Sequence, residues 1–447
     1  MSNRGKRKKK KNYKKRNGMV LFVFILLIVL VYVIGQKRED ESYASTTSAS
    51  IGEIIDVIER GQADVSRYIV YGTHLNIEGS IEITNPEIED VEIVAKKSSG
   101  EEITVDTTYE YESRNLSFST LDKINTGLDL ESLDVDNYYM LLKVTSSNGQ
   151  VSYYSLSNDT EYTDPIEYYT LTRNNSNNRI DIRFLTQNSA SAMALSVSKV
   201  SKLPNDVYDV VIDPGHGGND TGAISGTYQE YEIVLENGLE LKKKLENLGL
   251  KVLITRDGTE TDEYDTYNIY DEDGRVTMAN ESGAKILVSL HMNSNESDFV
   301  DGGVEVYAAP NLDLNLAKSF AANIVEEANT SYSEMETDKE EDGVYVRTIE
   351  IQNRNSSTFR GYNGVFDSIP YLFIIREIGG ISTGAYVNGS NPSYGENIYR
   401  NSNVGVEGYL IELGYMNVNS DLRNVLNNGD SYMQAITDSI NSYYHIN

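Results

Sequence analysis

The sequence predicts an α/β fold for the C-terminal half of the chain, built on a mixed, mostly parallel sheet with helices on both faces. An antiparallel β-sandwich is expected before this half, and a transmembrane helix at the N-terminus. Apolar strand patterns alternate with helical patterns after residue 207. Short runs rich in Tyr, Val, Ile and Thr fill residues 67–186, and a continuous apolar run follows a basic N-terminus. These three observations carry the prediction.

The N-terminus combines a basic cluster with an apolar run. The first 16 residues contain ten Lys or Arg and no acid, and 16 apolar residues follow at 19–34. At a rise of about 1.5 Å per residue the run spans roughly 24 Å, and flanking Lys and Arg side chains can extend to the interface. We therefore expect a basic cytoplasmic tail at 1–17 and a membrane anchor at 18–35, with the remaining chain extracellular. A cleaved signal peptide, which would give a secreted protein, is the alternative, with a poor cleavage site at 43–45.

The chain has 447 residues, enough for two or three domains, and no cysteine. The absence of cysteine excludes a thiol nucleophile, a disulfide framework and a cysteine metal site. Residues 1–40 hold twelve Lys or Arg and two acids, so 27 of the 39 basic and 66 of the 68 acidic residues remain, a balance of −39. Such a surface repels nucleic acid at long range, so no nucleic-acid partner is expected.

The stretch before the α/β half changes character twice. Residues 36–66 are rich in Ser, Thr and Ala at their start and are expected to form a stalk. In residues 67–186 about seven short strand patterns alternate with turns, and Asn148-Gly149 is a strong hairpin signal. This spacing is typical of an immunoglobulin-like sandwich, which we interpret as a spacer or binding domain. Its tyrosines either form a glycan-stacking face or occupy half-buried strand positions. His74 is expected to be structural.

Residues 187–206, rich in Ser, Ala and Asn, are expected to be a linker, and residues 207–447 the α/β domain. Its first strand covers 210–212 and ends at Pro214. Glycines on both sides of His216 let the backbone turn sharply. A histidine at a strand end beside glycines suits a metal site, and a glycine-rich turn with a chance histidine is the alternative.

A helix is expected from Glu230 to Gly249, because leucines recur at helical spacing and the glycine suits a C-terminal cap. Glu230 stands at the helix start, where the helix dipole favours an anion. It is therefore either a simple first-turn acid or a ligand. Glu232 is a rival ligand, but it would point elsewhere around the helix.

The rest of the domain continues the alternation. Further strands are expected at 251–255, 284–290, 302–308 and 371–376, and further helices at 275–280, around residues 316–324 and at 431–444. Residues 331–369 include an acidic run and few core signals, so they are interpreted as an insertion.

Two later motifs complete a candidate metal site. Ser289-Leu-His-Met-Asn places His291 at a strand end, and Tyr409-Leu-Ile-Glu-Leu-Gly-Tyr places Glu412 near the end of another strand. Two histidines and one glutamate, His216, Glu230 and His291, form a standard zinc set with an open fourth position. Glu412 could then act as general base on a water molecule.

The motif Asp213-Pro-Gly-His-Gly-Gly-Asn-Asp-Thr-Gly-Ala, followed by Glu230, the segment 275–280, Ser-Leu-His-Met-Asn and Glu-Leu-Gly-Tyr, resembles the zinc-dependent N-acetylmuramoyl-L-alanine amidases of the type 3 family. The resemblance covers about residues 207–447 in order and spacing. It implies Zn²⁺ as cofactor and Glu412 as the catalytic carboxylate. Tyr415 stands where the family often has Phe, and the chain before Glu412 is longer than usual.

The resemblance implies hydrolysis of the amide bond between N-acetylmuramic acid and L-alanine in peptidoglycan, in wall remodelling or daughter-cell separation. A zinc peptidase acting on the stem peptides and a non-catalytic cell-wall-binding protein remain alternatives. Some family members are held inactive by an inserted helix, so a regulatory role for residues 331–369 is a further hypothesis.

Overall fold

The computed structural model describes most of the chain from residue 61 onward. The described ranges are 61–84, 87–158, 165–187, 190–260, 274–295, 302–350, 368–378 and 402–446. The predicted basic tail, the anchor and residues 36–60 of the predicted stalk lie outside them, whereas the last five residues of the predicted stalk belong to a strand that begins at Gln62. Within these ranges, no helix has the length and apolar character needed to span a membrane.

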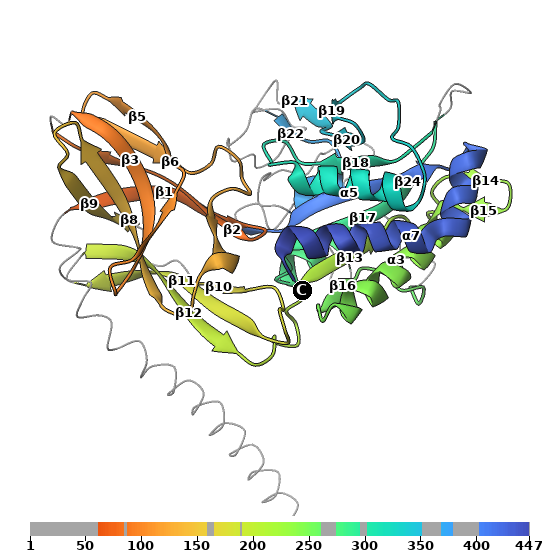
Figure 1. The fold of residues 1–447 in the computed structure, drawn as a ribbon, viewed down its shortest axis with the longest axis horizontal. Helices are drawn as coiled ribbons and strands as arrows, with labels where there is room; N and C mark the ends of the chain where they lie inside the picture. The colour runs from red at the N-terminus through yellow and green to blue at the C-terminus, as the bar shows by residue number, and fades with distance from the viewer. Residues whose placement is uncertain are drawn as a thin grey trace, which may run out of the picture. The chain divides into compact units, whose positions relative to one another are not determined.

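An antiparallel β domain occupies the first part of the described chain (Figure 1). Its elements are β1 (Gln62–Tyr71), β2 (His74–Glu82), β3 (Ile88–Lys97), β4 (Glu102–Val105), β5 (Thr108–Glu112), β6 (Asn115–Ser119), β7 (Leu128–Asp129), η1 (Leu130–Ser132), β8 (Asn137–Ser146), β9 (Val151–Ser157), β10 (Ile166–Tyr169), β11 (Asn177–Gln187) and β12 (Ala190–Val200). The main order is β10-β11-β12-β8-β9-β1-β2-β6-β5, in which β1 and β9 alone run parallel. The predicted hairpin at Asn148-Gly149 is confirmed, since it joins β8 and β9.

The stretch expected to be a linker contains a strand. β12 pairs with β11 along its whole length and with β8. Met193, Leu195 and Val197 are buried and alternate with Ala and Ser. This period of two is the strand signal, and the Ser- and Ala-rich composition conceals it.

The C-terminal half contains the predicted mixed, mostly parallel sheet, in the order β16-β13-β17-β24-β18-β20-β19. Its strands are β13 (Val210–Pro214), β16 (Val252–Ile254), β17 (Ile286–Asn293), β18 (Glu305–Ala308), β19 (Lys339–Glu341), β20 (Val344–Tyr345) and β24 (Glu407–Tyr415). β13, β16, β17 and β24 run parallel, and β18 pairs antiparallel with β24. Three smaller pairings involve β14 (Ile224–Ser225) with β15 (Tyr228–Gln229), β21 (Thr348–Glu350) with β22 (Ser368–Pro370), and β23 (Val404–Gly405) with β1.

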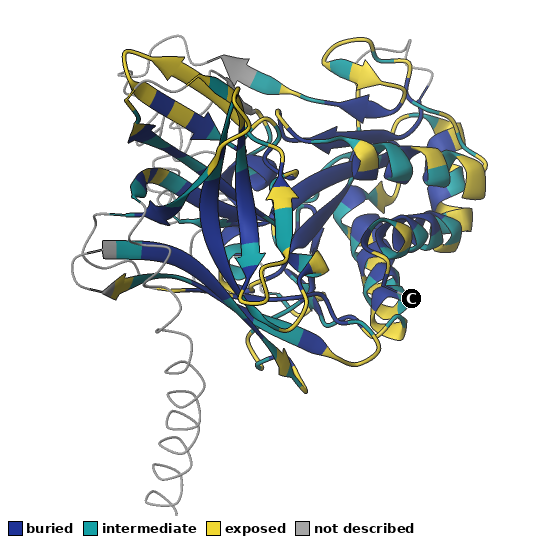
Figure 2. Ribbon diagram, turned by 60° about the vertical axis from the view of Figure 1, so that its left-hand side comes forward, coloured by how far each residue is buried: buried dark blue, intermediate teal, exposed yellow. Residues whose placement is uncertain are grey.

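Helices contact both faces of β24. The helices are α3 (Glu230–Asn247), α4 (Arg275–Glu281), α5 (Asn315–Glu327), α6 (Phe373–Glu377) and α7 (Asn419–Tyr444). The ring of Phe320 on α5 packs edge-on against Tyr409, whereas Gly408 faces Ile375 and Ile378 of the α6 segment. Because neighbouring residues of a strand point to opposite faces, α5 and α6 lie on opposite sides of β24. Buried residues accordingly follow the strands in Figure 2, and exposed ones lie on the outer surface of the helices.

One secondary-structure expectation needs correction. Residues 371–376, predicted as a strand, contain the start of α6, because a short apolar run cannot be told from a buried helix segment by periodicity. The segment 331–369, expected to be an insertion, is described at 331–350 and 368–369, and in part it extends the sheet. Val344 and Tyr345 of β20 are fully buried beside β18, so this part belongs to the core.

The β domain and the α/β domain lie within one compact unit, residues 60–447. Ile69, Tyr71, Ile124 and Leu171 of the β domain belong to the same hydrophobic cluster as the strands of the α/β sheet. β23 also pairs in parallel with β1. The two domains therefore share buried apolar surface in addition to the chain that joins them.

Candidate metal and catalytic site

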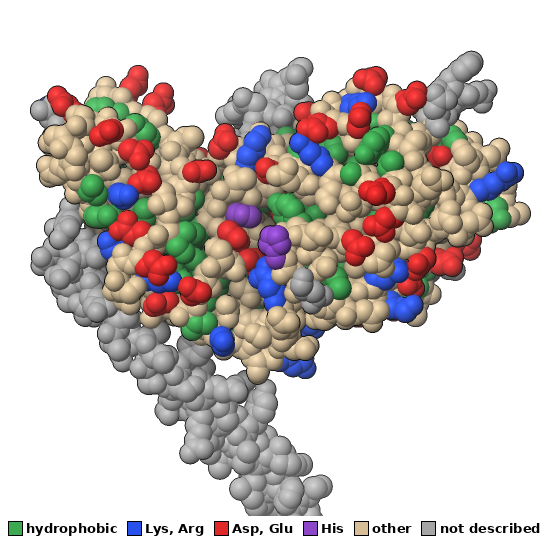
Figure 3. Space-filling model, in the orientation of Figure 1, with side chains coloured by type: hydrophobic (Ala, Val, Ile, Leu, Met, Phe, Trp, Pro, Cys, Tyr) green, Lys and Arg blue, Asp and Glu red, His purple; other side chains and the backbone are tan. Residues whose placement is uncertain are grey.

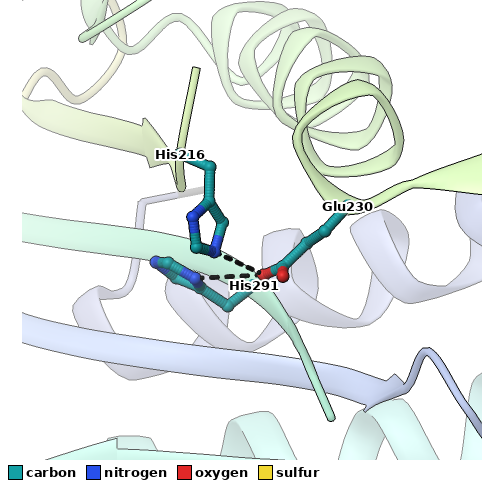
Figure 4. A group of neighbouring side chains, drawn as sticks. All are labelled: His216, Glu230 and His291. Atoms are coloured by element: carbon teal, nitrogen blue, oxygen red, sulfur yellow. Dashed lines mark hydrogen bonds and ion pairs between the residues drawn. The ribbon is translucent and has the colours of Figure 1, made fainter. Parts of the chain in front are cut away.

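Three side chains from three elements converge beside the sheet (Figure 4). His216 follows the end of β13, Glu230 is the first residue of α3, and His291 lies on β17. Nε2 of His216 lies 3.0 Å from Oε1 of Glu230, and Nδ1 of His291 lies 3.2 Å from the same oxygen. One potential ligand atom from each residue fits within 4.8 Å of the others. The structure thus brings together the three residues that the sequence analysis selected.

Glu230 is fixed by backbone amides as well as by the histidines. Its Oε1 accepts a hydrogen bond from N–H of Met292 (2.9 Å), and its Oε2 accepts one from N–H of Ala223 (2.9 Å). Burial alone would raise the pKa of Glu230, but the hydrogen bonds and charges of His216 and His291 hold it well below its usual range. Glu230 is therefore a buried carboxylate at the start of a helix, where the helix dipole also favours its charge.

His216 is held on its other side by a second carboxylate. Its Nδ1 lies 2.9 Å from Oδ2 of Asp220. Burial alone would lower the pKa of His216, but the carboxylates of Glu230 and Asp220 raise it above the ordinary value. A carboxylate on the far ring nitrogen fixes the orientation and tautomer of a ligand histidine. Asp220 supplies this contact, and its place four residues after His216 in the Gly-rich turn was the available sequence signal.

Glu412 lies opposite His291 on the neighbouring strand. The register of β17 and β24 pairs these two residues, so their side chains share one face of the sheet. Burial and the charges of Glu230 and Glu305 raise the pKa of Glu412 well above its ordinary value. Among the described residues, its Oε2 atom is buried without a hydrogen-bond partner. A carboxylate with one unpaired oxygen beside the three-residue cluster is suited to accept a proton.

The donor set fits a zinc ion. Two imidazoles and one carboxylate are the ligands of a catalytic zinc site with one open position, and they lie close enough to share one ion. Both histidines are partly exposed, at 21% and 19% of their side-chain surface, so the site is accessible from solvent.

Residues 210–359 match a protein-family model described as N-acetylmuramoyl-L-alanine amidase. The C-terminal half of this chain contains an amidase domain of that family. Glu412 lies beyond the matched range.

Two curated relatives illustrate the similarity. The germination-specific N-acetylmuramoyl-L-alanine amidase of Bacillus subtilis is 31% identical over 111 residues, which cover 24% of this chain and 47% of the relative. The N-acetylmuramoyl-L-alanine amidase AmiA of Escherichia coli is 36% identical over 104 residues, 23% of this chain and 32% of the relative. The match thus spans less than half the length of either relative. A solved amidase from Clostridium difficile 630 is 21% identical with a TM-score of 0.35, covering 54% of this chain and 97% of that one.

Two buried arginines of the amidase domain hold the turn that carries His216. Arg275 donates to the backbone oxygen of His216 (2.8 Å), and Arg256 donates to those of Pro214 (2.9 Å) and Gly215 (2.8 Å). The φ of His216 is +59°, a left-handed conformation that an L-residue adopts at some cost. The arginines stabilise this strained turn. Arg275 begins the segment 275–280 of the sequence motif, whereas Arg256 is followed by Asp and Gly, which in the sequence indicate only a turn.

The charge of Arg275 is balanced by Asp213. Nη1 of Arg275 lies 2.7 Å from Oδ1 of Asp213, which also accepts a hydrogen bond from the hydroxyl of Thr255 (2.7 Å). The other oxygen, Oδ2, accepts one from the hydroxyl of Ser289 (2.7 Å). Burial would raise the pKa of Asp213, but Arg275 and these two hydroxyls lower it. The Asp213 of the sequence motif is therefore a structural anion beneath the His216 turn.

Two glycines are required by close approach in the amidase site. A Cβ on Gly215 would lie 2.2 Å from Cε1 of His291. A Cβ on Gly222, which has φ of +61°, would lie 2.6 Å from Oε2 of Glu230 and 2.7 Å from Cδ2 of His216. Any larger residue at either position would displace a member of the cluster.

Glu232 and the other two histidines of the chain, His74 and His445, lie outside the cluster of His216, Glu230 and His291. Glu232 is not part of the cluster and accepts a hydrogen bond from the hydroxyl of Tyr231. His74 contacts Thr73 in the β domain, and His445 forms the C-terminal cap of α7. Acidic side chains are spread over the face of the molecule shown in Figure 3 and do not gather in one patch.

Proposed function

We propose that this chain hydrolyses the amide bond between N-acetylmuramic acid and L-alanine in peptidoglycan. The observation that carries the proposal is the convergence of His216, Glu230 and His291 beside Glu412 at one edge of the sheet. The amidase family of residues 210–359 supports the choice of substrate. The geometry by itself supports metal-assisted hydrolysis.

In this proposal His216, Glu230 and His291 hold the zinc ion. A zinc ion in such a site lowers the pKa of a water molecule to about 7 and polarises the carbonyl that is attacked. Asp220 orients the ring of His216, and the amides of Met292 and Ala223 orient the carboxylate of Glu230. Arg256 and Arg275 keep the His216 turn in place.

Glu412 is the proposed catalytic carboxylate. Its unpaired Oε2 accepts the proton of the attacking water molecule, and the same carboxyl group can return that proton to the nitrogen of the leaving L-alanine. Its position opposite His291 on the neighbouring strand places it beside the ligand set.

The experiment is mass analysis of purified peptidoglycan after digestion by the full-length chain in detergent, with zinc, with chelator, and with the His291→Ala variant. The expected products are stem peptides with a free L-alanine amine and glycan with a free lactyl carboxyl group, formed only by the wild-type chain with zinc. A free amine at another stem residue would identify a peptidase, and wall binding without products would identify a non-catalytic binding protein. Either result would overturn the proposal.

We also propose that residues 18–35 anchor the chain in the membrane, with residues 1–17 in the cytoplasm and the domains from residue 67 outside the cell. The basic cluster before the apolar run supports this orientation. The intact mass of the membrane-extracted protein tests it, since a cleaved leader would remove the anchor. We further interpret the antiparallel β domain as an immunoglobulin-like spacer or binding domain, followed by the amidase domain at 207–447.

A further inference from the structure

Glu305 is a fully buried carboxylate close to the proposed catalytic one. It lies on β18, and the antiparallel register places it directly opposite Glu412 on β24. Directly opposed side chains on neighbouring strands share one face of the sheet, with Cβ atoms roughly 5 Å apart. Glu305 is therefore adjacent to the site but is not one of the three candidate metal ligands, His216, Glu230 and His291.

Three donors from three different strands converge on this carboxylate. Oε1 accepts a hydrogen bond from the hydroxyl of Tyr415 at the end of β24. Oε2 accepts hydrogen bonds from the amide of Asn293 at the end of β17 (2.8 Å) and from the hydroxyl of Tyr307 on β18 itself (2.8 Å). One side chain thus links the ends of the two strands that carry His291 and Glu412.

An irregularity in the sheet makes this link possible. His291 pairs with Glu412, but Asn293 pairs with Tyr415, so β24 contains one more residue than β17 between these two pairs. Such a bulge changes the face to which the following side chains point. Tyr415 is thereby turned to the same face as Asn293 and reaches Glu305. Gly414, with φ of +151°, stands within the bulge.

We propose that Glu305 is a positioning residue of the amidase site, which holds the ends of β17 and β24 together and so fixes the placement of Glu412 relative to His291. This inference rests on the proposed function. A carboxylate accepts from all three donors at once, whereas a neutral amide of the same size presents two N–H groups on one side and cannot do so. The buried hydroxyl or amide left without an acceptor would then shift one strand end.

The first test is Glu305→Gln in the full-length chain, assayed on purified peptidoglycan fragments. We expect kcat to fall by roughly 10- to 100-fold, as for other residues that orient a metal site, with KM changed by less than about threefold and zinc content unchanged. Glu377→Gln is the matched control, because Glu377 is an equally buried glutamate, paired with Arg376 on α6 outside the metal cluster. It should retain kcat within about twofold even if it lowers thermal stability.

The second test separates positioning from general stability. Tyr415→Phe and Tyr307→Phe each remove one hydroxyl that donates to Glu305, but only Tyr415 lies on the strand that carries Glu412. We expect Tyr415→Phe to lower kcat by about tenfold and Tyr307→Phe by less than about threefold. This pair keeps the inference testable if Glu305→Gln does not fold.

The outcomes distinguish this inference from the proposed function. A wild-type chain that binds zinc but releases no L-alanine amine would remove the proposed function, and the positioning role with it. An active wild-type chain in which Glu305→Gln keeps its kcat would overturn the positioning role alone. Equal losses in Tyr415→Phe and Tyr307→Phe would do the same, since they would indicate a general effect on stability.

Discussion

Strand β24 carries a glutamate near each end, and the two have opposite surroundings. Glu407, at the amino end, faces the β domain. It accepts hydrogen bonds from the amide of Asn125 (3.1 Å) and from the hydroxyl of Tyr409. Glu412, toward the carboxyl end, lies beside the three candidate metal ligands, and its Oε2 has no hydrogen-bond partner among the described residues. Burial raises the pKa of both carboxyl groups. The carboxyl group of Glu407 is hydrogen-bonded to a residue of the β domain and so helps to join the two domains. The carboxyl group of Glu412 has an oxygen available for proton transfer.

The largest expected effect comes from Glu412→Gln. If Glu412 is the proton acceptor, this isosteric change should lower kcat by about 100- to 10,000-fold, because it removes the general base and leaves the zinc ligands in place. Zinc content and thermal stability, measured beside the wild-type chain, serve as controls. Full turnover in a folded, zinc-loaded variant would refute the assignment.

A smaller effect at the same end is expected from Gly215→Ala. The added methyl group would overlap the ring of His291, so zinc affinity should fall by roughly 10- to 100-fold, as measured by competition with a chromophoric chelator. Gly226→Ala is the control, since Gly226 has φ of +62° but no atom within 4 Å of the added Cβ. It should strain the backbone without changing zinc affinity. Wild-type affinity in Gly215→Ala would contradict the packing described here.

At the amino end the comparison predicts a pH dependence of stability. Burial raises the pKa of Glu407 from 4.5 to about 7, against the opposing hydrogen bonds from Tyr409 and Asn125. The folded chain therefore retains a proton that the unfolded chain loses above pH 4.5. The contribution of the protonated Glu407 to the free energy of unfolding is complete below pH 4.5 and is lost as the pH rises through about 7. The total loss is about 3 kcal/mol.

Glu407→Gln isolates this contribution. The free energy of unfolding of the wild-type chain, relative to this variant, should decrease between pH 4.5 and pH 8 in urea titrations. A relative stability that stays constant or increases over this range would show that Glu407 does not titrate as described.

The smallest effect is expected from Asn125→Ala. Asn125 donates to Glu407 and to the backbone oxygen of Asp313 (3.1 Å) and accepts from the N–H of Asp313 (2.7 Å). Its removal should destabilise the chain by about 1–3 kcal/mol in urea denaturation and leave zinc affinity unchanged. Thr126→Ala, which removes an exposed hydroxyl bonded to Lys123, should cost less than about 0.5 kcal/mol. Equal effects of the two variants would contradict a specific role for Asn125.

The sequence indicated which candidate residues lie close together better than it indicated the contacts around them. His216, Glu230, His291 and Glu412 belong to motifs at strand or helix ends, where parallel strands bring side chains to one edge. No sequence signal marks Glu305 in this way. Only the register of β18 with β24 shows that this glutamate lies opposite Glu412. The contact of Asn125 with Glu407 joins residues 282 positions apart, which no local pattern encodes.

The fold shows the same limits. The strand–helix alternation after residue 207 predicted the mixed sheet, because period and length distinguish those elements clearly. The strand β12 was not predicted, because its Ser- and Ala-rich composition conceals the alternation of larger apolar residues with Ala and Ser. The helix α6 was not predicted, because the apolar run at 371–375 is compatible with either a strand or a helix. Both errors occur where the local pattern is short or masked, and tertiary packing decides the outcome.

The carboxylate of Glu230 accepts hydrogen bonds from the backbone N–H groups of Ala223 and Met292. Because every residue except proline has a backbone N–H, replacing either side chain by another residue retains both hydrogen bonds. Substitutions at residues 223 and 292 by any residue except proline are therefore expected to leave the carboxylate of Glu230 in place, so these two positions can vary without loss of its orientation.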